Sequence, residues 1–471
     1  MSRLPTVGAD SNTWGTVLND FLSVSLKADG TPKPVFMVSG ADPTGTADST
    51  SVIQAAMDAA GVAGGGIALL PVAGTYKTSA SLVFNYDNVI LRGVGWGTII
   101  QPASGAQFDV ISTPIPGSVG LSGFVRNYIG VCDLQINCTN MTGTTAGQGN
   151  GIHLYGTRYS YFCNLFIQSC KNWAILSDGD NTGPGNNFGY DNVFYKCIFD
   201  LCNANIWTVN SEANDIVECR FKWCGGTCAA SQPAFTPQDT TGLHCRCSGG
   251  YMYIAGNIFG KGGTYTTEAI RCSNSGPCRI IGNRFDQVRN QAVVLNAGNH
   301  EFAFNALGSP GSAITGVPGI QIGSSSNRVI GNSFDTTAGG SNYTYAVAES
   351  GGPFSNNIIA DNHLLAGTSG VISLNATSTD KVHHNTNYNP LGFSVAQPAV
   401  PASTVNATNN SGVDCMVHIA GGTLTVVTVG GTATGITAAA AAGSVHTVRV
   451  PAGQTIAITY TGAPTWKWYG D

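Results

Sequence analysis

A three-residue motif recurs along most of this 471-residue chain: Cys or Asn, then any residue, then Leu or Phe. Successive copies lie roughly 20 to 40 residues apart, and each has the composition of a short strand. The residues that open the copies are Cys132, Cys163, Cys197, Cys219, Asn257, Asn283, Asn305, Asn332 and Asn362, with a degraded copy at Asn385. One such repeat cannot bury its own apolar residues, so the copies must stack in a solenoid.

A second motif, a small residue followed by an aliphatic one, lies between the copies, for example at Gly151-Ile152 and Ala269-Ile270. Two strand signals per repeat, joined by turns of changing length, describe one coil of a solenoid. We therefore predict an all-β chain, built over residues 35–395 as a right-handed, single-stranded parallel β-helix. About a dozen coils, spaced by about 4.8 Å, would form a rod about 55–60 Å long.

The composition fits this prediction and excludes other classes. Gly contributes 62 residues and charged residues only 10%, whereas coiled coils are rich in Glu and Lys. Hydrophobic residues make up 42%, too many for a disordered chain. The net charge is −5 with scattered Lys and Arg, and no apolar run is long enough to span a bilayer. We expect no nucleic-acid partner, no membrane insertion and no cofactor.

The repeat also accounts for most of the 14 cysteines. At the Cys/Asn position they would stack from coil to coil, first as four Cys and then as Asn residues whose amides hydrogen-bond along the ladder. Cys acts there as a small buried apolar residue, and no metal is expected. Two alternatives stay open for Cys224 and Cys228: a surface disulfide between them, or a zinc site together with the nearby Cys219, His244 and Cys247.

The N-terminal end of such a solenoid needs a cap. Residues 48–61 predict an amphipathic helix with Ile53, Ala56, Met57 and Ala60 on one face, which would cover the first coil. The segments around it are Gly40-Ala-Asp-Pro-Thr-Gly45, Gly64-Gly-Gly66, Leu70-Pro71 and Gly74-Thr-Tyr76. Together they resemble the opening of the pectate-lyase-like superfamily of parallel β-helices. That resemblance implies the fold alone, because the superfamily includes lyases, hydrolases and non-catalytic adhesins.

Residues 1–34 form a distinct segment that ends at Pro32 and Pro34. It predicts a short helix with Trp14, Val17, Leu18 and Phe21 along one side, and it resembles the N-terminal segment of many bacteriophage tail fibre and minor tail proteins. Such an apolar stripe needs a partner, which is a neighbouring subunit, a tail baseplate or the chain's own β-helix. We expect a virion-attachment or oligomerisation segment.

The C-terminal end changes in composition. Residues 396–404 predict a linker, and residues 405–471 alternate apolar and polar positions between Gly-rich turns, as in an antiparallel β-sandwich. This module resembles the small C-terminal β module of actinobacteriophage tail proteins. Its last strand carries Trp466 and Trp468, which could stack on sugar rings or serve as core or subunit contacts.

Strand alternation predicts an outward stripe in the strands of the second motif, beginning with His153, Leu176, Trp207, His244 and Arg271. An aromatic ring, an imidazole and a guanidinium group in a row suit a sugar chain, so Trp207, His244 and Arg271 are candidate glycan-binding residues. The alternatives are burial against another subunit or an ordinary surface. The same alternation of inward and outward residues places Glu349 on the inward side. Either the alternation shifts at this strand or an acid is buried.

Asp286 and Asp335 are candidate catalytic residues. Each is the third residue after its Asn and points outward, and they lie two coils, about 9.6 Å, apart. Inverting glycosidases hold their two carboxyl groups about 6.5–9.5 Å apart. The alternative is that each aspartate caps the turn at the end of its strand.

These features favour a phage tail spike or tail fibre that binds host cell-surface glycan. The alternative is a tail-spike depolymerase, a glycoside hydrolase or lyase, so the residues do not decide whether the chain is an enzyme. A bacterial pectate-lyase-like enzyme is disfavoured by the tail-like start and the lack of a signal peptide. The resemblance implies a homotrimer that joins the phage tail or baseplate through residues 1–34. We expect a virion component made in the host cytoplasm.

Overall fold

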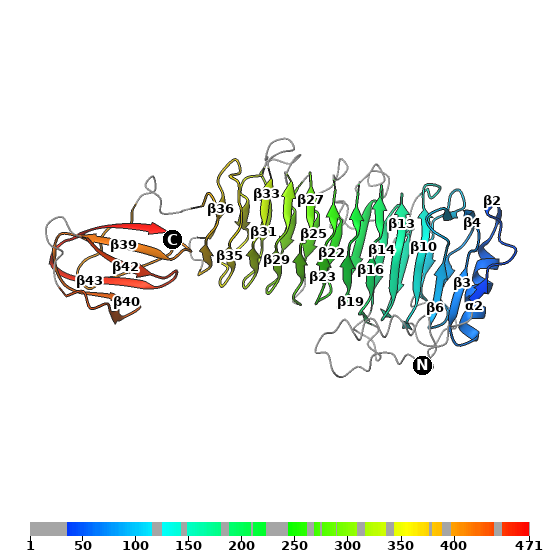
Figure 1. Ribbon diagram of the computed structural model, residues 1–471, viewed down its shortest axis with the longest axis horizontal. Coiled ribbons are helices and arrows are strands. Elements are labelled where there is room, and N and C mark those ends of the chain that lie inside the picture. Colours follow the sequence, from blue (N-terminus) through cyan, green and yellow to red (C-terminus); the bar gives the residue numbers. More distant parts are fainter. Residues whose placement is uncertain are drawn as a thin grey trace, which may run out of the picture.

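The structure is a computed structural model, and it describes residues 35–114, 125–142, 148–179, 188–208, 211–222, 244–260, 268–273, 276–288, 290–308, 316–335, 343–375, 379–388, 397–437 and 445–470. The predicted attachment segment 1–34 and the pair Cys224 and Cys228 lie outside these residues. Figure 1 shows the described chain as a rod of stacked strands, with a helix at one end and a small antiparallel unit at the other.

The strands of the rod stack in three long parallel rows. Row A contains β1 (Val35–Met37), β3 (Gly66–Leu69), β6 (Val89–Arg92), β10 (Gly130–Asn137), β13 (Tyr161–Gln168), β16 (Val193–Tyr195), β20 (Asp215–Val217), β23 (Tyr253–Ala255), β26 (Arg279–Ile281), β29 (Glu301–Ala303), β32 (Arg328–Ile330), β35 (Ile358–Ala360) and β37 (Lys381–His383). Row B contains β2 (Thr44–Asp48), β4 (Gly74–Thr78), β7 (Thr98–Pro102), the long strands β10 and β13 again, β17 (Ile198–Asp200), β21 (Arg220–Phe221), β24 (Ile258–Phe259), β27 (Arg284–Asp286), β30 (Ala306–Gly308) and β33 (Ser333–Asp335). Row C contains β5 (Leu82–Val83), β8 (Ile111–Ser112), β11 (Ile152–Tyr155), β14 (Trp173–Asp178), β18 (Ala204–Thr208), β22 (Cys245–Cys247), β25 (Ile270–Cys272), β28 (Val293–Leu295), β31 (Ile320–Ile322), β34 (Val347–Glu349) and β36 (Ile372–Ser373). A fourth, short row contains β9 (Arg126–Asn127), β12 (Thr157–Arg158), β15 (Gly189–Tyr190) and β19 (Ser211–Glu212).

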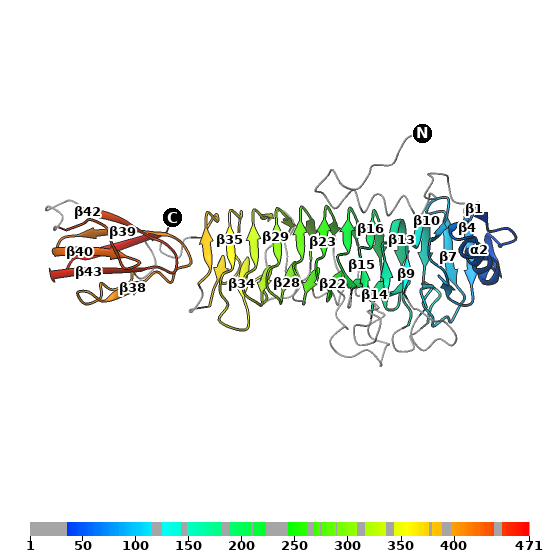
Figure 2. The ribbon, with the colours of Figure 1, turned by 90° about the horizontal axis from the view of Figure 1, so that it is seen from below.

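From β3 onward the chain passes through rows A, B and C in turn, and the strands of each row pair in parallel with their counterparts in neighbouring coils. Figure 2 shows this stacking from below. The predicted all-β fold with parallel coils is therefore confirmed, as expected for a parallel β-helix. The two sequence motifs indicated rows B and C, because from β16 onward each row A strand lies just before the Cys/Asn position and has no turn signal of its own.

Inward side chains stack along the rod axis and fill its core. In row B the rings of Phe199, Phe221, Phe259 and Phe285 lie on one another, with centroids 4.6–5.0 Å apart along the series. Aromatic stacking of this kind adds to the free energy gained by removing apolar area from water.

The predicted Asn ladder is confirmed from Cys197 onward. The backbone N–H of Cys219 donates to Oδ1 of Asn257 at 2.7 Å, and both the backbone N–H and Nδ2 of Asn257 donate to Oδ1 of Asn283. The same pair of bonds recurs from Asn283 through Asn305, Asn332 and Asn362 to Asn385. One side chain per coil thus satisfies a buried backbone donor of the coil before it.

The prediction for the first two cysteines was wrong. Cys132 pairs in register with Cys163, and Cys163 pairs with Tyr195 rather than with Cys197. Phe166 lies opposite Ile198, which places Leu165 level with Cys197. Cys132 and Cys163 instead pack with Ile90 in a small cluster apart from the main core. Leu and Cys are both apolar, and both fit a buried position of the ladder. The residue types alone therefore did not show which of the two occupies it.

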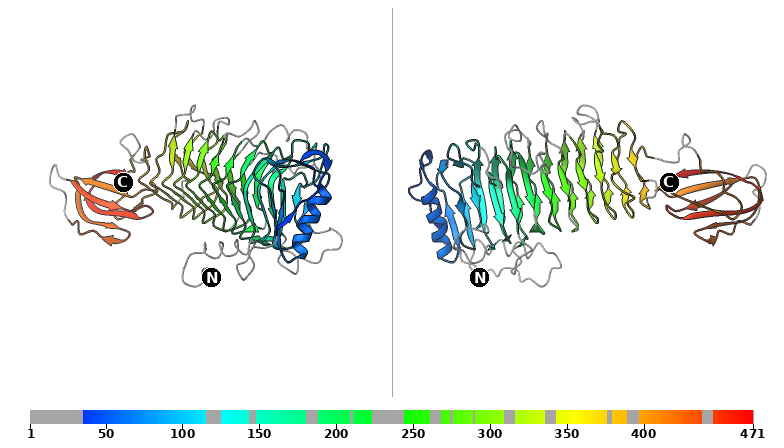
Figure 3. Two further views of the ribbon diagram at one scale, coloured as in Figure 1. Left: turned by 45° about the vertical axis from the view of Figure 1, so that its right-hand side comes forward. Right: turned by 180° about the vertical axis from the view of Figure 1, so that it is seen from behind.

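The predicted cap is the helix α2 (Thr50–Val62), which packs on the first coils of the rod (Figure 3). Ile53, Met57 and Ala60 are buried, as expected. Gly61 lies inside the helix instead of ending it. A Cβ atom there would lie 2.3 Å from the Tyr86 side chain, so the close approach of the helix to that ring requires glycine.

The C-terminal unit consists of two antiparallel sheets. One contains β38 (Asn406–Thr408), β43 (Thr455–Gly462), β40 (Thr423–Val429) and β41 (Thr432–Ala433), and the other β42 (Val445–Val450), β39 (Cys415–Ala420) and β44 (Thr465–Gly470). Part of the predicted linker packs against this unit, because the backbone oxygens of Pro398 and Pro401 accept hydrogen bonds from Trp466 and Tyr460.

Glu349, which the predicted phase turned inward, is a buried acid near the end of the rod. It is 8% exposed, and its carboxyl oxygens accept hydrogen bonds from Asn357 Nδ2 and the Asn375 backbone N–H, each at 2.9 Å. Burial, followed by the hydrogen bond with Asp380, raises the pKa of Glu349 from 4.5 to about 7.

Replacing Glu349 by glutamine is therefore expected to remove part of the pH dependence of stability. A raised carboxyl pKa lowers stability as pH rises from about 4.5 to 7, because the unfolded chain loses this proton first. Glutamine cannot ionise, but it has one acceptor oxygen where the carboxyl group accepts two hydrogen bonds, so it also carries a cost of about 1–3 kcal/mol that is the same at both pH values. By chemical denaturation, the fall in the free energy of unfolding between pH 4 and pH 8 is expected to be about 1–3 kcal/mol smaller in E349Q than in wild type. An equal fall in the two proteins would contradict this.

Candidate functional site

The two candidate acids lie in one pocket on the side of the rod. Asp286 pairs in register with Gly308, which pairs with Asp335, so the acids are two coils apart as predicted. The pocket has a volume of about 480 Å³, and both carboxylates line it together with Arg284 and His363. We call it the acid pocket.

Gly308 keeps the acid pocket open. It occupies the coil between the two aspartates, and a Cβ atom at that position would lie 3.2 Å from Oδ1 of Asp286. A larger side chain there would therefore fill the gap between the two carboxylates. Arg284 holds Asp286 from the side, with Nη2 3.2 Å from Oδ1 and 3.1 Å from Oδ2. The pocket thus combines hydrogen-bond acceptors with a cationic donor.

The predicted glycan stripe is present in part on the outer side of row C. Trp207 lies in register with Arg246, and Arg246 with Arg271. The Arg246 guanidinium lies over the Trp207 ring, 4.7 Å from its centroid, and Trp173 packs on the same ring at 5.2 Å. Arg271 is half-buried and makes a bidentate pair with buried Glu268.

His244 was wrongly placed in this stripe. Its backbone lies level with Asn205 and Ala269, two positions before the outward residue, and the side chain is fully buried. Nδ1 lies 2.8 Å from Asn205 Nδ2, and Nε2 lies 3.1 Å from the Gly260 oxygen. Burial lowers its pKa from 6.5 to about 4, so it is a neutral core histidine.

The slip arose because Cys245 fills the aliphatic position of its coil. The small-aliphatic motif also matches Gly242-Leu243, which made His244 the outward residue, whereas the residue that points outward is Arg246, two places after His244.

The tryptophans near the C-terminus are core residues, the second of the two alternatives. Trp466 is 6% and Trp468 is 1% exposed, and their rings pack edge to face with centroids 5.4 Å apart. They cannot stack on sugar rings in this position.

Of the zinc alternative, the structure describes Cys219, His244 and Cys247, and these three do not form a metal group among themselves, while Cys224 and Cys228 lie outside the described residues. Within the described ranges, the groups whose ligand atoms lie close enough for one metal are Cys247, Cys272 and Cys278, and Asp361, His383 and His384. The three cysteines of the first group are fully buried in the core.

Two residues of the predicted outward stripe, His153 and Leu176, are buried. His153 belongs to a charge cluster on row C that was missed. His153 is 6% exposed, with Nδ1 2.8 Å from Asp109 Oδ2 and Nε2 3.3 Å from Asp178 Oδ2. Burial alone would lower the pKa of His153, but the hydrogen bonds and charges of Asp109 and Asp178 outweigh it and raise the pKa to about 9. The imidazole is therefore a cation at neutral pH, and Asp109 lies 44 residues earlier, where no local pattern links it to His153.

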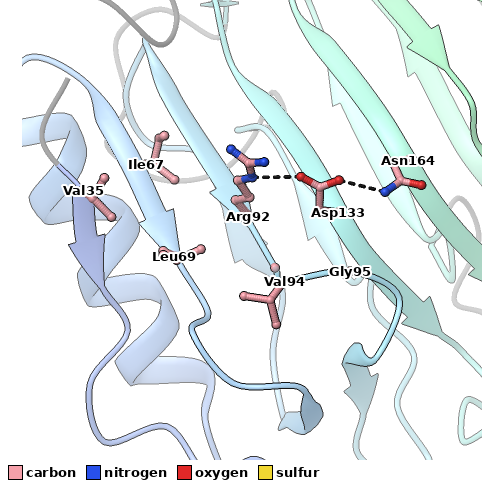
Figure 4. Close-up of a pocket in the computed structure, with 9 residues that line it drawn as sticks. Val35, Ile67, Leu69, Arg92, Val94, Gly95, Asp133 and Asn164 are labelled. Atoms are coloured by element: carbon pink, nitrogen blue, oxygen red, sulfur yellow. Dashed lines mark hydrogen bonds and ion pairs between the residues drawn. The ribbon is translucent and has the colours of Figure 1, made fainter. Parts of the chain in front are cut away.

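A second pocket, of about 490 Å³, lies near the N-terminal end of the rod (Figure 4). Its polar groups bind one another: Arg92 Nε and Asn164 Nδ2 each donate to Asp133 at 2.8 Å. Val35 and Val94 add exposed apolar surface. Because Asp133 is already paired on both oxygens, this pocket offers a ligand less than the acid pocket does.

No protein-family model matches the chain, and no relative was found among curated proteins. Among solved structures, the DFA-IIIase of Arthrobacter chlorophenolicus A6 without its lid is 13% identical, with a TM-score of 0.51 over 75% of this chain and 94% of that one. ORF18 of Geobacillus virus E2 is 14% identical, with a TM-score of 0.45 over 96% of this chain and 80% of that one. Pre-mature gene product 12 of bacteriophage phi29 is 12% identical, with a TM-score of 0.43 over 75% of this chain and 56% of that one. At these identities the likeness to the DFA-IIIase shows a shared fold alone. In the part of the chain that the structure describes, no helix has the length and apolar character needed to cross a bilayer.

Proposed function

We propose that the chain is a phage tail spike or tail fibre that binds a host cell-surface glycan in the acid pocket. The observation that carries this proposal is the gap that Gly308 leaves between Asp286 and Asp335 on the side of the rod. Carboxylates accept hydrogen bonds from sugar hydroxyls, and Arg284 can donate to sugar oxygens, with stronger bonds because these groups are charged. The pocket is open, so a long polymer can cross it.

In this proposal the chain keeps the architecture predicted from its sequence. Residues 1–34 attach to the phage tail or baseplate, a right-handed β-helix forms the shaft of a homotrimer, and residues 405–471 form a β-sandwich module of the actinobacteriophage type. The support for a virion location is the resemblance of the two end segments to phage tail proteins. The Trp207, Arg246 and Arg271 stripe is a second contact for the same polymer.

A second candidate function is cleavage of that glycan. Asp286 and Asp335 are separated by two strand spacings, about 9.6 Å, near the upper end of the range for inverting glycosidases. One carboxyl would protonate the leaving oxygen while the other activates water. The same pocket therefore supports either binding alone or binding with hydrolysis.

Binding to a panel of purified bacterial cell-wall and capsular polysaccharides tests the proposal. We expect wild type to bind at least one of them, and Gly308→Leu and Asp286→Asn to weaken that binding at least tenfold. Asp200→Asn is the matched control, because Asp200 holds the same position in row B, several coils away from the pocket. It is expected to bind like wild type.

New reducing ends that disappear in Asp286→Asn and Asp335→Asn would assign hydrolysis to the pocket. Retained binding without any product would leave a binding protein. Equal binding by wild type and folded Gly308→Leu would contradict a role for the pocket.

A further inference from the structure

The last coil of the rod carries two adjacent histidines beside an aspartate of the coil before it. His383 ends β37, the last strand of row A, and His384 follows it. Asp361 follows β35 on the preceding coil, and β35 pairs in register with β37. A ligand shared by these three side chains would therefore join the last two coils.

The distances between the three groups match the edges of a small metal site. His383 Nδ1 lies 3.3 Å from His384 Nδ1, and His384 Nδ1 lies 3.3 Å from Asp361 Oδ1. All three ligand atoms lie within 4.8 Å of one another. A tetrahedral Zn²⁺ with bonds of about 2.0–2.1 Å places neighbouring ligand atoms about 3.3 Å apart, so two of the three edges need almost no movement.

The backbone explains why these side chains meet. Asp361 and His384 both have positive φ, 56° and 53°, at the same turn of successive coils. A left-handed residue after an extended strand turns the chain so that the rings of His383 and His384 lie on one side, with centroids 4.9 Å apart.

The three groups are also accessible and of suitable chemistry. The side chains of His384 and Asp361 are 66% and 58% exposed, so a cation can enter from solvent. Two imidazoles and one carboxylate favour Zn²⁺ over Mg²⁺ or Ca²⁺, which prefer oxygen ligands throughout. Three protein ligands leave one position for water.

We propose that Asp361, His383 and His384 bind a zinc ion that clips the final coil to the coil before it. The final row A strand pairs with β35 on one side, and on the other Val382 is held by a hydrogen bond to Gly412 of the C-terminal unit. The end of a solenoid lacks the stacking that supports its middle, so a link at this place strengthens the weakest coil of the rod.

Calorimetric titration of the full chain with Zn²⁺ tests the proposal. The protein is made without a polyhistidine tag and stripped with a chelator before use. We expect one saturable site per chain, weakened at least tenfold in His384→Asn and Asp361→Asn. Asparagine tolerates positive φ, so both variants keep the turn. His418→Ala, which removes a histidine that packs on Tyr469 in the C-terminal unit, is the control and is expected to bind like wild type.

Two further measurements keep the outcome clear. Zn²⁺ is expected to raise the Tm of wild type and of His418→Ala but not of His384→Asn. Bound Co²⁺ is expected to lack the charge-transfer absorption of thiolate ligands. The proposal would be overturned if Zn²⁺ did not bind to wild type, or if the two Asn variants bound Zn²⁺ as tightly as wild type does. A thiolate absorption band would also overturn it, because the cation would then be bound by cysteines.

Discussion

Replacing Asp109 by alanine is expected to lower the free energy of unfolding by about 3–5 kcal/mol at pH 7. The change removes the nearer carboxylate from buried His153 and leaves the imidazolium with only Asp178, whose contact is longer. It also removes the acceptor of two hydrogen bonds from Asn150, at 2.8 and 2.9 Å. Chemical denaturation followed by circular dichroism measures the loss.

The pH dependence separates this cluster from ordinary surface charges. The pKa of His153 is raised from 6.5 to about 9, so its contribution is fully present below pH 6.5 and is lost as pH rises through about 9. Wild type is expected to lose on the order of 3 kcal/mol over that interval through this group. In Asp109→Asn, which keeps the shape but not the charge, the fall is expected to be smaller.

The exposed pair of Lys196 and Glu218, 3.6 Å apart, provides a control. Glu218→Gln is expected to change stability by less than about 1 kcal/mol, because exposed pairs are screened by water. If Asp109→Ala were no more destabilising than Glu218→Gln at pH 7, the buried cluster would not be ionised as described.

Replacing Asn305 by alanine is expected to cost about 3–5 kcal/mol. Its side chain makes four hydrogen bonds: Oδ1 accepts from the backbone N–H and Nδ2 of Asn283, and Nδ2 donates to the Ile280 oxygen and to Asn332 Oδ1. Alanine leaves the Asn283 backbone N–H buried without a partner and opens a cavity.

Two other substitutions in the ladder calibrate this loss. Asn305→Cys is expected to cost less than Asn305→Ala, because Cys219 already fills a rung in this protein and its Sγ accepts the Cys197 N–H at 3.4 Å. Asn385→Ala, at the end of the ladder, is also expected to cost less, because Asn385 is 8% exposed and Asn305 only 1%, so water can reach the groups that lose their partner. Denaturation midpoints compare the three. If Asn305→Ala unfolded at the same denaturant concentration as wild type, the ladder would not stabilise the rod.

The parts of the fold that were predictable are those in which the same residue type repeats at the same place. The Asn ladder was visible because each rung needs an amide that both donates and accepts, and few residues other than Asn meet that need. The helix that caps the rod was visible because Ile53, Met57 and Ala60 repeat at helical spacing.

Residues were assigned to the wrong strand position wherever one apolar residue can replace another. Cys245 fills an aliphatic position, so the outward stripe was assigned to His244 instead of Arg246. Leu165 fills a rung position, so Cys163 was placed in the ladder. Trp466 and Trp468 alternate as a half-buried strand should, and alternation cannot tell which face lies against the core.

The candidate sites were also predictable only in part. The spacing of Asp286 and Asp335 followed from counting coils, but the pocket between them depends on Gly308 and on His363 from a later coil. The His153 cluster and the Asp361, His383 and His384 group join residues from different coils. Only the winding of the chain brings those residues together.

The most direct test of the proposed function is a cryo-electron microscopy map of the protein with the polysaccharide that binds it most tightly. Sugar density over Gly308, within hydrogen-bond distance of both Asp286 and Asp335, is the expected result. An empty acid pocket at saturating polysaccharide, with the sugar bound elsewhere on the chain, would contradict it.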